Sequence, residues 1–344
     1  PPFSSRRRHT RSGPQSRGLG DVYKRQEYDF NTPWYRPTRI NHVLSGGEYG
    51  WRNGAGKYPE FYIDNLPATL NIGPGSPTGT TFGYGARFPA QYQNALYVLD
   101  WSWGKIYAVH LKPEGASYTA TKEEFITGGP LPVTDAIIHP DGAMYFAIGG
   151  RRVQSGLYRV TYTGKESTAP VKHQSAKLPL HDLRRSLEGF HGVQNPKAVA
   201  AAWPHLGHSD RFIRAAARTA LEHQPVSEWN MKALGETDAT AQFEALLALT
   251  RVESSKKDSS IHHAILSALL KHNPEDLTRE QRLAYVRILQ IVLDRFGDPS
   301  PQILDTSATR LDAIYPAKTF EENWLLTETL AYLQSPDTAS KAMA

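Results

Sequence analysis

The sequence of 344 residues predicts a multidomain protein that is β-rich first and α-rich afterwards, and three observations lead to this fold class. Between Thr134 and Tyr162, three runs of β-branched and aromatic residues alternate with glycine-containing turns, a pattern typical of an antiparallel meander. Beyond about residue 180 the apolar residues recur at helical spacing instead. Between the two patterns lies a polar stretch, residues 166–180, which we expect to be a linker.

The formal charge of +5 is concentrated at the N-terminal end of the sequence. Residues 1–26 contain seven arginines and lysines against one aspartate, which gives +6 there and leaves −1 for the rest of the chain. We therefore expect no nucleic-acid partner. No run approaches the ~20 apolar residues of a membrane span, and no signal peptide is visible. The chain has no cysteine, which excludes disulfides and covalent haem within it.

The basic N-terminal stretch does not read like part of a folded domain. Ser16 to Gln26 reads SRGLGDVYKRQ, which resembles, over all eleven codons, the one-frame translation of a transposase-based sequencing adapter. We therefore expect residues 1–26 to be disordered, and the natural sequence, truncated at this point, to begin near Glu27. The alternative is a basic nucleic-acid-binding arm.

Residues 27–165 are expected to form short antiparallel strands. Residues 53–80 are rich in glycine and proline and are predicted to be a long loop, of a kind that is usually functional or covers a surface. Pro140-Asp141-Gly142 is a hairpin signal, since the glycine accepts a positive φ. The predicted strands are Arg39–Leu44, Ala95–Leu99, Lys105–Leu111, Lys122–Ile126 and the three runs of the meander, Ala136–Ile138, Met144–Ile148 and Leu157–Val160.

Many short strands separated by Gly/Pro turns favour a sandwich, a barrel or a propeller. Their grouping into small antiparallel sets suits the blades of a propeller. The strands amount to roughly two blades, whereas a closed propeller needs ~4 or more. We therefore expect residues 27–165 to be a partial, truncated β-propeller.

Residues 181–335 are predicted to be a HEAT-like α-solenoid, because successive helices each have an apolar face that they cannot bury alone. Asp210 is an expected N-cap, and Thr278 with Gln281 resembles a capping box. Residues 336–344 are expected to be a tail. The predicted helices are His181–Phe190, Pro196–Trp203, Asp210–His223, Ala239–Arg251, Ser260–His272, Arg279–Phe296 and Thr319–Leu333.

Several runs of this sequence are similar to a known family. TRINHVLSGGEYGWR (38–52), LYVLDWSWGKIYAVHL (96–111) and TDAIIHPDGAMYFAIGGRRVQSGLYRV (134–160) resemble the C-terminal part of the glucose/sorbosone dehydrogenase-like β-propeller. LHDLRRSLEGFHG (180–192) resembles the helical region of a subgroup of large bacterial proteins. In that subgroup HEAT-like helices follow the propeller and precede a c-type cytochrome module. The resemblance covers about Glu27 to Arg251.

The resemblance implies a six-bladed propeller that uses pyrroloquinoline quinone and calcium, but the quinone-binding residues carry over poorly. The family's quinone-binding lysine falls near Ser102 here. The two arginines that precede an aspartate in the next blade fall on Pro132 and Thr134, and only Asp135 remains. The blade with the catalytic histidine has no counterpart in this sequence. The resemblance therefore implies the fold more strongly than it implies quinone binding or catalysis.

The candidate ligand-binding residues lie in three short stretches of the sequence. Trp101 and Trp103 would stack on a sugar or a cofactor; alternatively, one packs between blades while the other covers the propeller face. Arg151 and Arg152 would clamp an anion, or else form a solvated turn. The histidines have no carboxylate or thiolate partner at metal spacing, so no metal site is predicted, and no catalytic residue is assigned. The candidates are Asp100, Trp101, Ser102, Trp103, Thr134, Asp135, Arg151 and Arg152.

These observations favour a fragment of an extracytoplasmic, periplasmic quinoprotein-like sugar or alcohol dehydrogenase. The intact parent would use the quinone and calcium and pass electrons to a c-type haem module, while the fragment itself is expected to be inactive. The alternative is a non-enzymatic propeller–solenoid scaffold that binds carbohydrate or protein through the helical solenoid. A histidine-bearing blade upstream and a CxxCH motif downstream in the gene would favour the enzyme.

Overall fold

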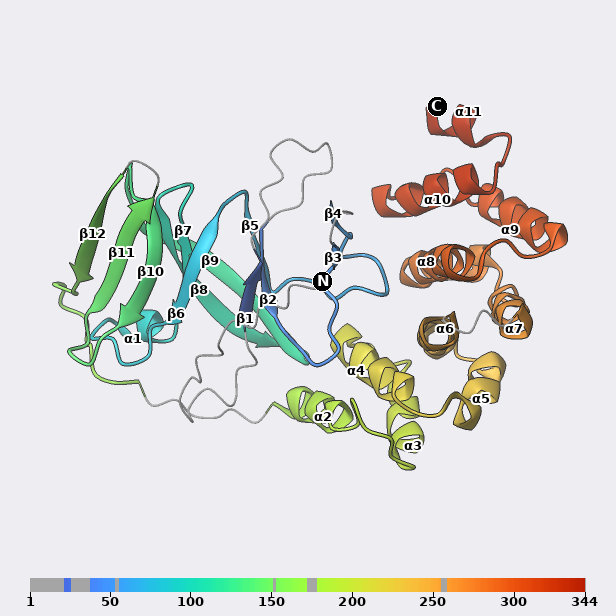
Figure 1. Cartoon of the computed structure of the whole chain (residues 1–344), viewed down its shortest axis with the longest axis horizontal. Helices are drawn as coiled ribbons and strands as arrows, with labels where there is room; N and C mark the ends of the chain where they lie inside the picture. Colours follow the sequence, from blue (N-terminus) through green and yellow to red (C-terminus); the bar gives the residue numbers. More distant parts are fainter. Residues whose placement is uncertain are drawn as a thin grey trace, which may run out of the picture. The chain divides into compact units, whose positions relative to one another are not determined.

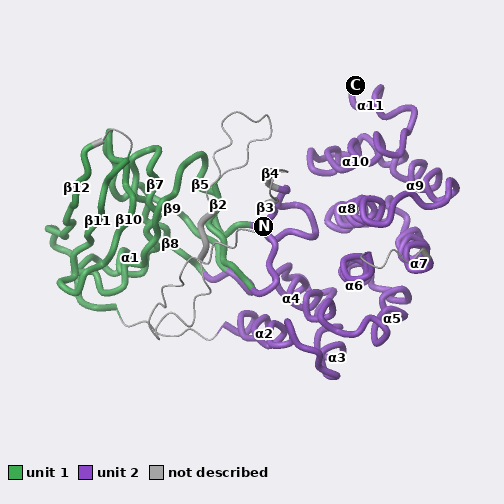
Figure 2. The backbone as a smooth tube through the Cα atoms, in the orientation of Figure 1, with its two compact units in different colours: residues 1–44, 68–112, 118–177 green, residues 45–67, 113–117, 178–344 purple. Residues whose placement is uncertain are grey.

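The computed structural model describes residues 22–25, 38–52, 56–150, 153–171, 178–254 and 259–343. The chain divides into two compact units (Figure 2). The β unit comprises residues 1–44, 68–112 and 118–177, and the helical unit comprises residues 45–67, 113–117 and 178–344. Two segments of the strand-rich half, residues 45–67 and 113–117, therefore belong with the helices.

The order of β structure followed by α structure is confirmed (Figure 1). In its described part the β unit contains three sheets, and these do not close into a barrel or a ring of blades. It also contains the short helix α1 (Ala90–Gln93). The sheets have the strand orders β1 (Val22–Arg25)–β2 (Thr38–His42)–β5 (Leu70–Gly73), β6 (Pro77–Phe82)–β7 (Leu96–Asp100)–β8 (Lys105–Glu114)–β9 (Ser117–Thr127), and β10 (Val133–Ile138)–β11 (Met144–Gly150)–β12 (Val153–Val160).

Strand β7 is the centre of the β unit, because both of its faces are buried. Successive side chains of a strand point to opposite faces of the sheet. Tyr97 and Leu99 accordingly join one core cluster with Phe146 of β11. Leu96 and Val98 join a second cluster with Ile40 of β2. The four-stranded sheet thus has an apolar core on each face, which explains why the run ALYVL is apolar throughout.

The predicted meander is confirmed: β10 pairs with β11, and β11 pairs with β12, all antiparallel. Gly142 in its first turn has a φ of +82°, as the hairpin signal requires. The prediction of one long loop over residues 53–80 is wrong, because β5 and most of β6 lie within it. Their partners are β2 and β7, and this long-range backbone pairing outweighs the local content of glycine and proline.

The expectation that residues 1–26 have no regular structure is wrong for Val22–Arg25. These residues form strand β1, which pairs antiparallel with β2. An exposed strand edge presents unpaired backbone N–H and C=O groups, and an extended segment of almost any sequence pairs with them. The other residues of 1–26 lie outside the described part of the chain.

We call residues 45–67 the inserted segment, because they lie in the strand-rich half of the sequence but belong to the helical unit. The helical unit has its own core, which runs from Tyr62 of this segment to Leu330. The inserted segment also contains the two-stranded pair β3 (Trp51–Arg52)–β4 (Gly56–Lys57). No helix in the described ranges is long and apolar enough to cross a membrane. The helices are α2 (Pro179–Glu188), α3 (Ala198–Ala202), α4 (Arg211–Glu222), α5 (Asn230–Gly235), α6 (Ala239–Glu253), α7 (Ser259–Leu269), α8 (Arg279–Phe296), α9 (Pro301–Ala313), α10 (Phe320–Tyr332) and α11 (Thr338–Met343).

All seven predicted helices are present within a few residues of their predicted bounds, whereas α5, α9 and α11 were not predicted. Helices α2, α4, α6, α8 and α10 pack in succession, each against the next (Figure 1). Helices α6, α8 and α10 begin at residues 239, 279 and 320, so their starts are 40 and 41 residues apart. The predicted caps are confirmed: Asp210 caps α4, and Thr278 with Gln281 forms a capping box on α8.

Asp210 joins two parts of the helical unit, so we expect Asp210→Ala to destabilise it more than the loss of an ordinary cap. Its Oδ1 accepts from the N–H groups of Phe212 and Ile213, and its Oδ2 accepts from Ala116 N at 2.7 Å. Gly115 has a φ of +56°, and a Cβ there would clash with the same Oδ2. A cap is worth ~1 kcal/mol and a buried N–H left unpaired costs ~1–3 kcal/mol. We expect a loss of about 2–3 kcal/mol in chemical denaturation.

Asp238→Ala is the matched control, since Asp238 caps α6 through Ala241 N alone. It should cost only ~1 kcal/mol. Equal losses in the two variants would show that the contact with Ala116 contributes nothing.

Candidate functional site

Asp100 ends β7 and organises the turn that was predicted to bind a ligand. Its side chain is fully buried, and its Oδ1 accepts from the backbone N–H groups of Ser76 and Ser102, each at 3.0 Å, and of Trp103 at 3.3 Å. A carboxylate with three such donors fixes the turn. This carboxyl oxygen is therefore committed to holding the backbone.

The two tryptophans of the turn are both anchored. The indole N–H of Trp101 donates to Gly149 O at 2.8 Å, and that of Trp103 donates to Pro74 O at 2.8 Å. Trp101 also packs on Gly150, where a Cβ would lie 2.8 Å from its ring. Trp103 remains 48% exposed. Trp101 thus packs against the β unit, while Trp103 covers its surface.

The second candidate stretch, which holds Thr134 and Asp135 in β10, is linked to the first through the backbone of β11. Thr134 donates its hydroxyl to Ala147 O at 3.1 Å, and Gly149 N donates to Pro132 O at 3.0 Å. Because Trp101 also binds Gly149, the backbone of β11 joins the turn at Asp100 to the stretch that holds Thr134. Asp135 is exposed. Arg151 and Arg152 lie outside the described residues.

A shallow hollow of about 380 Å³ lies on the outer face of the meander sheet. Apart from Asp135 and His139, its lining is apolar or aromatic, and Ile137 and Leu157 are 54% and 72% exposed. It therefore offers an apolar surface and little that would fix a polar ligand. Its lining residues are Asp135, Ala136, Ile137, His139, Tyr145, Ala147 and Leu157.

The described residues around Asp100 and Thr134 do not fit the quinone that the family resemblance implies. That cofactor carries several carboxylates, which need cations or strong donors. Ser102, Pro132 and Thr134 are uncharged, and the buried carboxylate of Asp100 is adjacent. Among the described residues, no group of three or more His, Cys, Asp or Glu side chains is placed to hold a metal ion.

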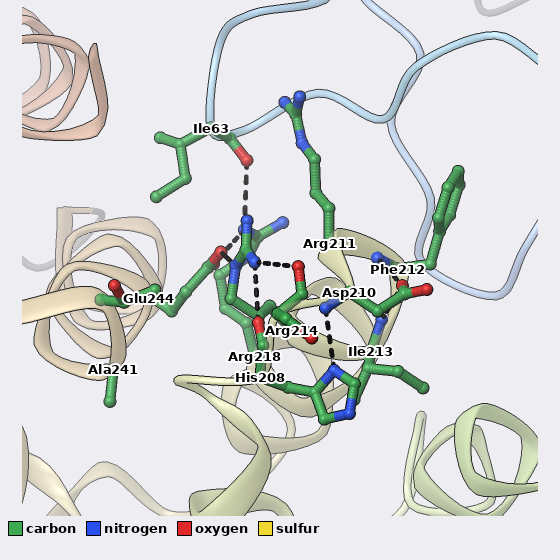
Figure 3. A network of polar contacts seen from close by, with 12 residues as sticks. Ile63, His208, Asp210, Arg211, Phe212, Ile213, Arg214, Arg218, Ala241 and Glu244 are labelled. Carbon is green, nitrogen blue, oxygen red and sulfur yellow. Dashed lines mark hydrogen bonds and ion pairs between the residues drawn. The ribbon is translucent and has the colours of Figure 1, made fainter. Parts of the chain in front are cut away.

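The helical unit contains a polar network that the sequence did not reveal, and it holds the inserted segment in place. Arg211 donates to the backbone carbonyls of Glu60, Tyr62 and Asn65. Arg218 donates to Ile63 O at 3.4 Å and to Glu244 Oε2 at 2.6 Å (Figure 3). Arginines of one helix thus bind successive carbonyl groups of an extended stretch of chain.

Arg287 of α8 binds the same stretch of chain through the carboxylate of Asp64. Nε and Nη2 each donate to an oxygen of Asp64 at 3.0 Å, which makes a bidentate pair. The guanidinium also lies 4.1 Å from the ring centroid of Tyr62. Burial alone would raise the pKa of Asp64, but the hydrogen bond and charge of Arg287 outweigh it and hold that pKa below its usual value.

The positive charge in this network exceeds the negative charge that faces it. Glu244 is shared by Arg214 at 3.2 Å and Arg218 at 2.6 Å. Arg211 has no ion-pair partner among the described carboxylates, and burial lowers its pKa to about 10. Figure 3 shows Arg214 and Arg218 converging on Glu244 while Arg211 points away from it. A signal was present in the sequence: Arg211, Arg214 and Arg218 lie at i, i+3 and i+7, on one helix face.

Comparisons with known proteins do not identify a family for this chain. No family model matches the chain, and no curated protein matches it. Among solved structures, one that is similar is an oxidoreductase (glucose dehydrogenase) from Thermus thermophilus. It is 20% identical over 36% of this chain and 37% of its own length, with a TM-score of 0.28. The chain thus spans little more than a third of that protein.

Proposed function

We propose that the chain is part of a quinoprotein-like sugar or alcohol dehydrogenase of the glucose/sorbosone type. In this proposal the β unit is a partial propeller, and the helical unit is a HEAT-like solenoid. The whole protein would be extracytoplasmic and would pass electrons to a c-type haem module. The support for this assignment is the resemblance of the runs at 38–52, 96–111 and 134–160 to that family.

The observation that favours the propeller assignment is the burial of β7 on both faces. A blade within a propeller has a neighbouring sheet on each side, and the clusters around Leu99 and Val98 lie on opposite faces of the same sheet. The 40- and 41-residue spacings of α6, α8 and α10 agree with a HEAT-type repeat of ~40–47 residues. Side chains of neighbouring helices also bond to each other near their first turns, as Arg282 of α8 does to Glu322 of α10 at 2.7 Å.

We expect this chain itself neither to bind the quinone nor to oxidise an aldose. The positions that would supply cations are Ser102, Pro132 and Thr134. Charge-assisted hydrogen bonds are worth ~1.5–3 kcal/mol each, so losing several removes tight binding. Calorimetric titration with pyrroloquinoline quinone and calcium should give no saturable heat. Saturable micromolar binding, or aldose-dependent dye reduction, would contradict the assignment of these positions.

The variant Ser102→Lys/Thr134→Arg tests whether cations at these two positions allow the chain to bind the quinone. It restores two cations in the stretches that β11 joins, so it should show weak saturable binding where the unmodified chain shows none. Thr163→Lys/Ser167→Arg is the control, because it adds the same two positive charges at exposed positions elsewhere in the β unit. Equal binding by both variants would indicate nonspecific attraction to the anionic quinone.

A second candidate function is a non-enzymatic scaffold that binds protein or carbohydrate. It is favoured by the way Arg211, Arg218 and Arg287 hold residues 60–65, since this is how a solenoid binds an extended peptide. The flanking sequence of the gene separates the two candidates. A histidine-bearing blade and a CxxCH motif support the dehydrogenase, and their absence from the complete gene would support the scaffold.

A further inference from the structure

A cavity of about 420 Å³ lies in the helical unit, where the first turns of α4, α6 and α8 meet the inserted segment. One part of its lining is polar and includes Arg211, Arg214 and Arg279. Another part is apolar and includes Phe61, Phe243 and Leu283. This size and this division into a charged wall and an apolar wall are typical of small-molecule sites. Nothing in the proposed dehydrogenase function uses this cavity.

The charged wall has more positive than negative charge. Its lining contains three arginines, Arg211, Arg214 and Arg279, against two carboxylates, Glu244 and Glu280. Glu244 is buried and is shared by Arg214 and Arg218. Arg218 also approaches Glu222 at 3.5 Å, but that carboxylate is shared with Arg251 at 2.9 Å. Buried cations without matching anions are costly, so an anion in the cavity would be stabilised.

Hydrogen-bond donors remain for such an anion. Arg214 uses Nε for Glu244 and Nη1 for the carbonyls of His208 and Ser209, while the structure gives its Nη2 no protein acceptor among the described residues. Arg279 at the mouth is 38% exposed and pairs with Glu321 at 2.9 Å. The partial positive ends of α4, α6 and α8 act in the same direction. The donors and the field both favour negative charge.

We propose that this cavity binds a small organic anion: a carboxylate or phosphate group on a compact apolar body. Arg214 would bind the anionic group in the charged wall, and the rings of Phe61 and Phe243 would cover the apolar body. The two anionic groups share the chemistry that guanidinium recognises, so the choice between them is made by experiment.

The probes are phenyl phosphate, benzoate and inorganic phosphate, titrated into the full chain by calorimetry. At least one aromatic probe should bind saturably with one site per chain, at least tenfold more tightly than inorganic phosphate, because it also buries apolar surface. Binding should weaken as salt is added. A preference for phenyl phosphate or for benzoate identifies the anionic group. Absence of saturable binding by both aromatic probes at millimolar concentration overturns the proposal.

Arg214→Gln should weaken the aromatic probe at least tenfold. Arg279→Gln gives a second test that spares the buried network, and we expect a smaller loss, about threefold. Its matched control is Arg185→Gln on α2, where the arginine is 42% exposed and also pairs with a carboxylate, Asp182. Arg185→Gln should leave the affinity unchanged. Equal loss in Arg185→Gln and Arg279→Gln, or unchanged affinity in a folded Arg214→Gln protein, overturns the proposal. None of these titrations involves the quinone, so their outcome is independent of the proposed dehydrogenase function.

Discussion

Asp64→Asn is expected to destabilise the helical unit by about 3–5 kcal/mol, the cost of removing one partner of a buried ion pair. The side chains of Asp64 and Arg287 are only 8% and 13% exposed, and their bidentate contact joins the inserted segment to α8. Without the carboxylate, a largely buried guanidinium would keep its hydrogen bond to Gln290 Oε1 at 3.2 Å and its contacts with the rings of Tyr58 and Tyr62, but would have no anion opposite it. Thermal unfolding should show a fall of ~2–4 °C for each kcal/mol lost.

The pair can be tested by a double-mutant cycle. Asp64→Asn/Arg287→Met removes both charges, so it should cost clearly less than the sum of the two single variants. The exposed pair of Asp182 and Arg185 supplies the control, and Asp182→Asn should change stability by no more than ~0.5 kcal/mol. If Asp64→Asn costs as little as Asp182→Asn, the contact does not hold the segment to the helices.

The stability that Asp64 contributes should also depend on pH. The pKa of Asp64 is lower in the folded protein than in the unfolded chain, where it is ~3.9. The unfolded state therefore binds the proton first as the pH falls, and stability falls with it. The contribution of the pair should be complete above about pH 5 and lost as the pH falls through the folded pKa. Urea unfolding at pH 6 and pH 3 should show the difference between the wild-type chain and Asp64→Asn shrinking at the lower pH.

The elements that local pattern determines were predicted from the sequence, and those that distant partners determine were not. The meander and the seven predicted helices follow from the periodicity of apolar residues and from capping residues that are close in sequence. Strand β5 exists because Leu70 pairs with Ile40, and β6 exists because Phe82 pairs with Leu96. The inserted segment is bound by residues such as Arg211 and Arg287, about 150 and 220 positions later in the sequence. No local pattern carries that information.

The candidate site divides in the same way. The sequence singled out Asp100, Trp101 and Thr134 as candidate ligand-binding residues, and the structure links the turn at Asp100 to Thr134 of β10 through the backbone of β11. The sequence could not show that Asp100 is buried or that its Oδ1 accepts from three backbone N–H groups, because the positions of those donors depend on the turn geometry. No function was predicted for the arginines of α4 from the sequence. Only their position against Glu244 and the inserted segment makes them part of a cavity.

Leu99→Ala is expected to destabilise the β unit by about 2–5 kcal/mol. Leu99 is fully buried on β7, in the core cluster that also holds Ile106 and Phe146. Removing most of its side chain forfeits the transfer free energy and leaves a cavity, because sheet on either side limits collapse of the site. Leu157→Ala is the matched control: the same substitution at a side chain that is 72% exposed should change stability by no more than ~0.5 kcal/mol.

Hydrogen exchange distinguishes a local effect of Leu99→Ala from a general one. The core of the helical unit is built from residues of that unit alone, so amides of α6 should keep their protection while those of β7 and β11 exchange faster. Amides of a cooperative unit report the free energy of opening that unit. If α6 loses protection to the same extent as β7, the two cores unfold as one, and the division into a β unit and a helical unit has no energetic meaning.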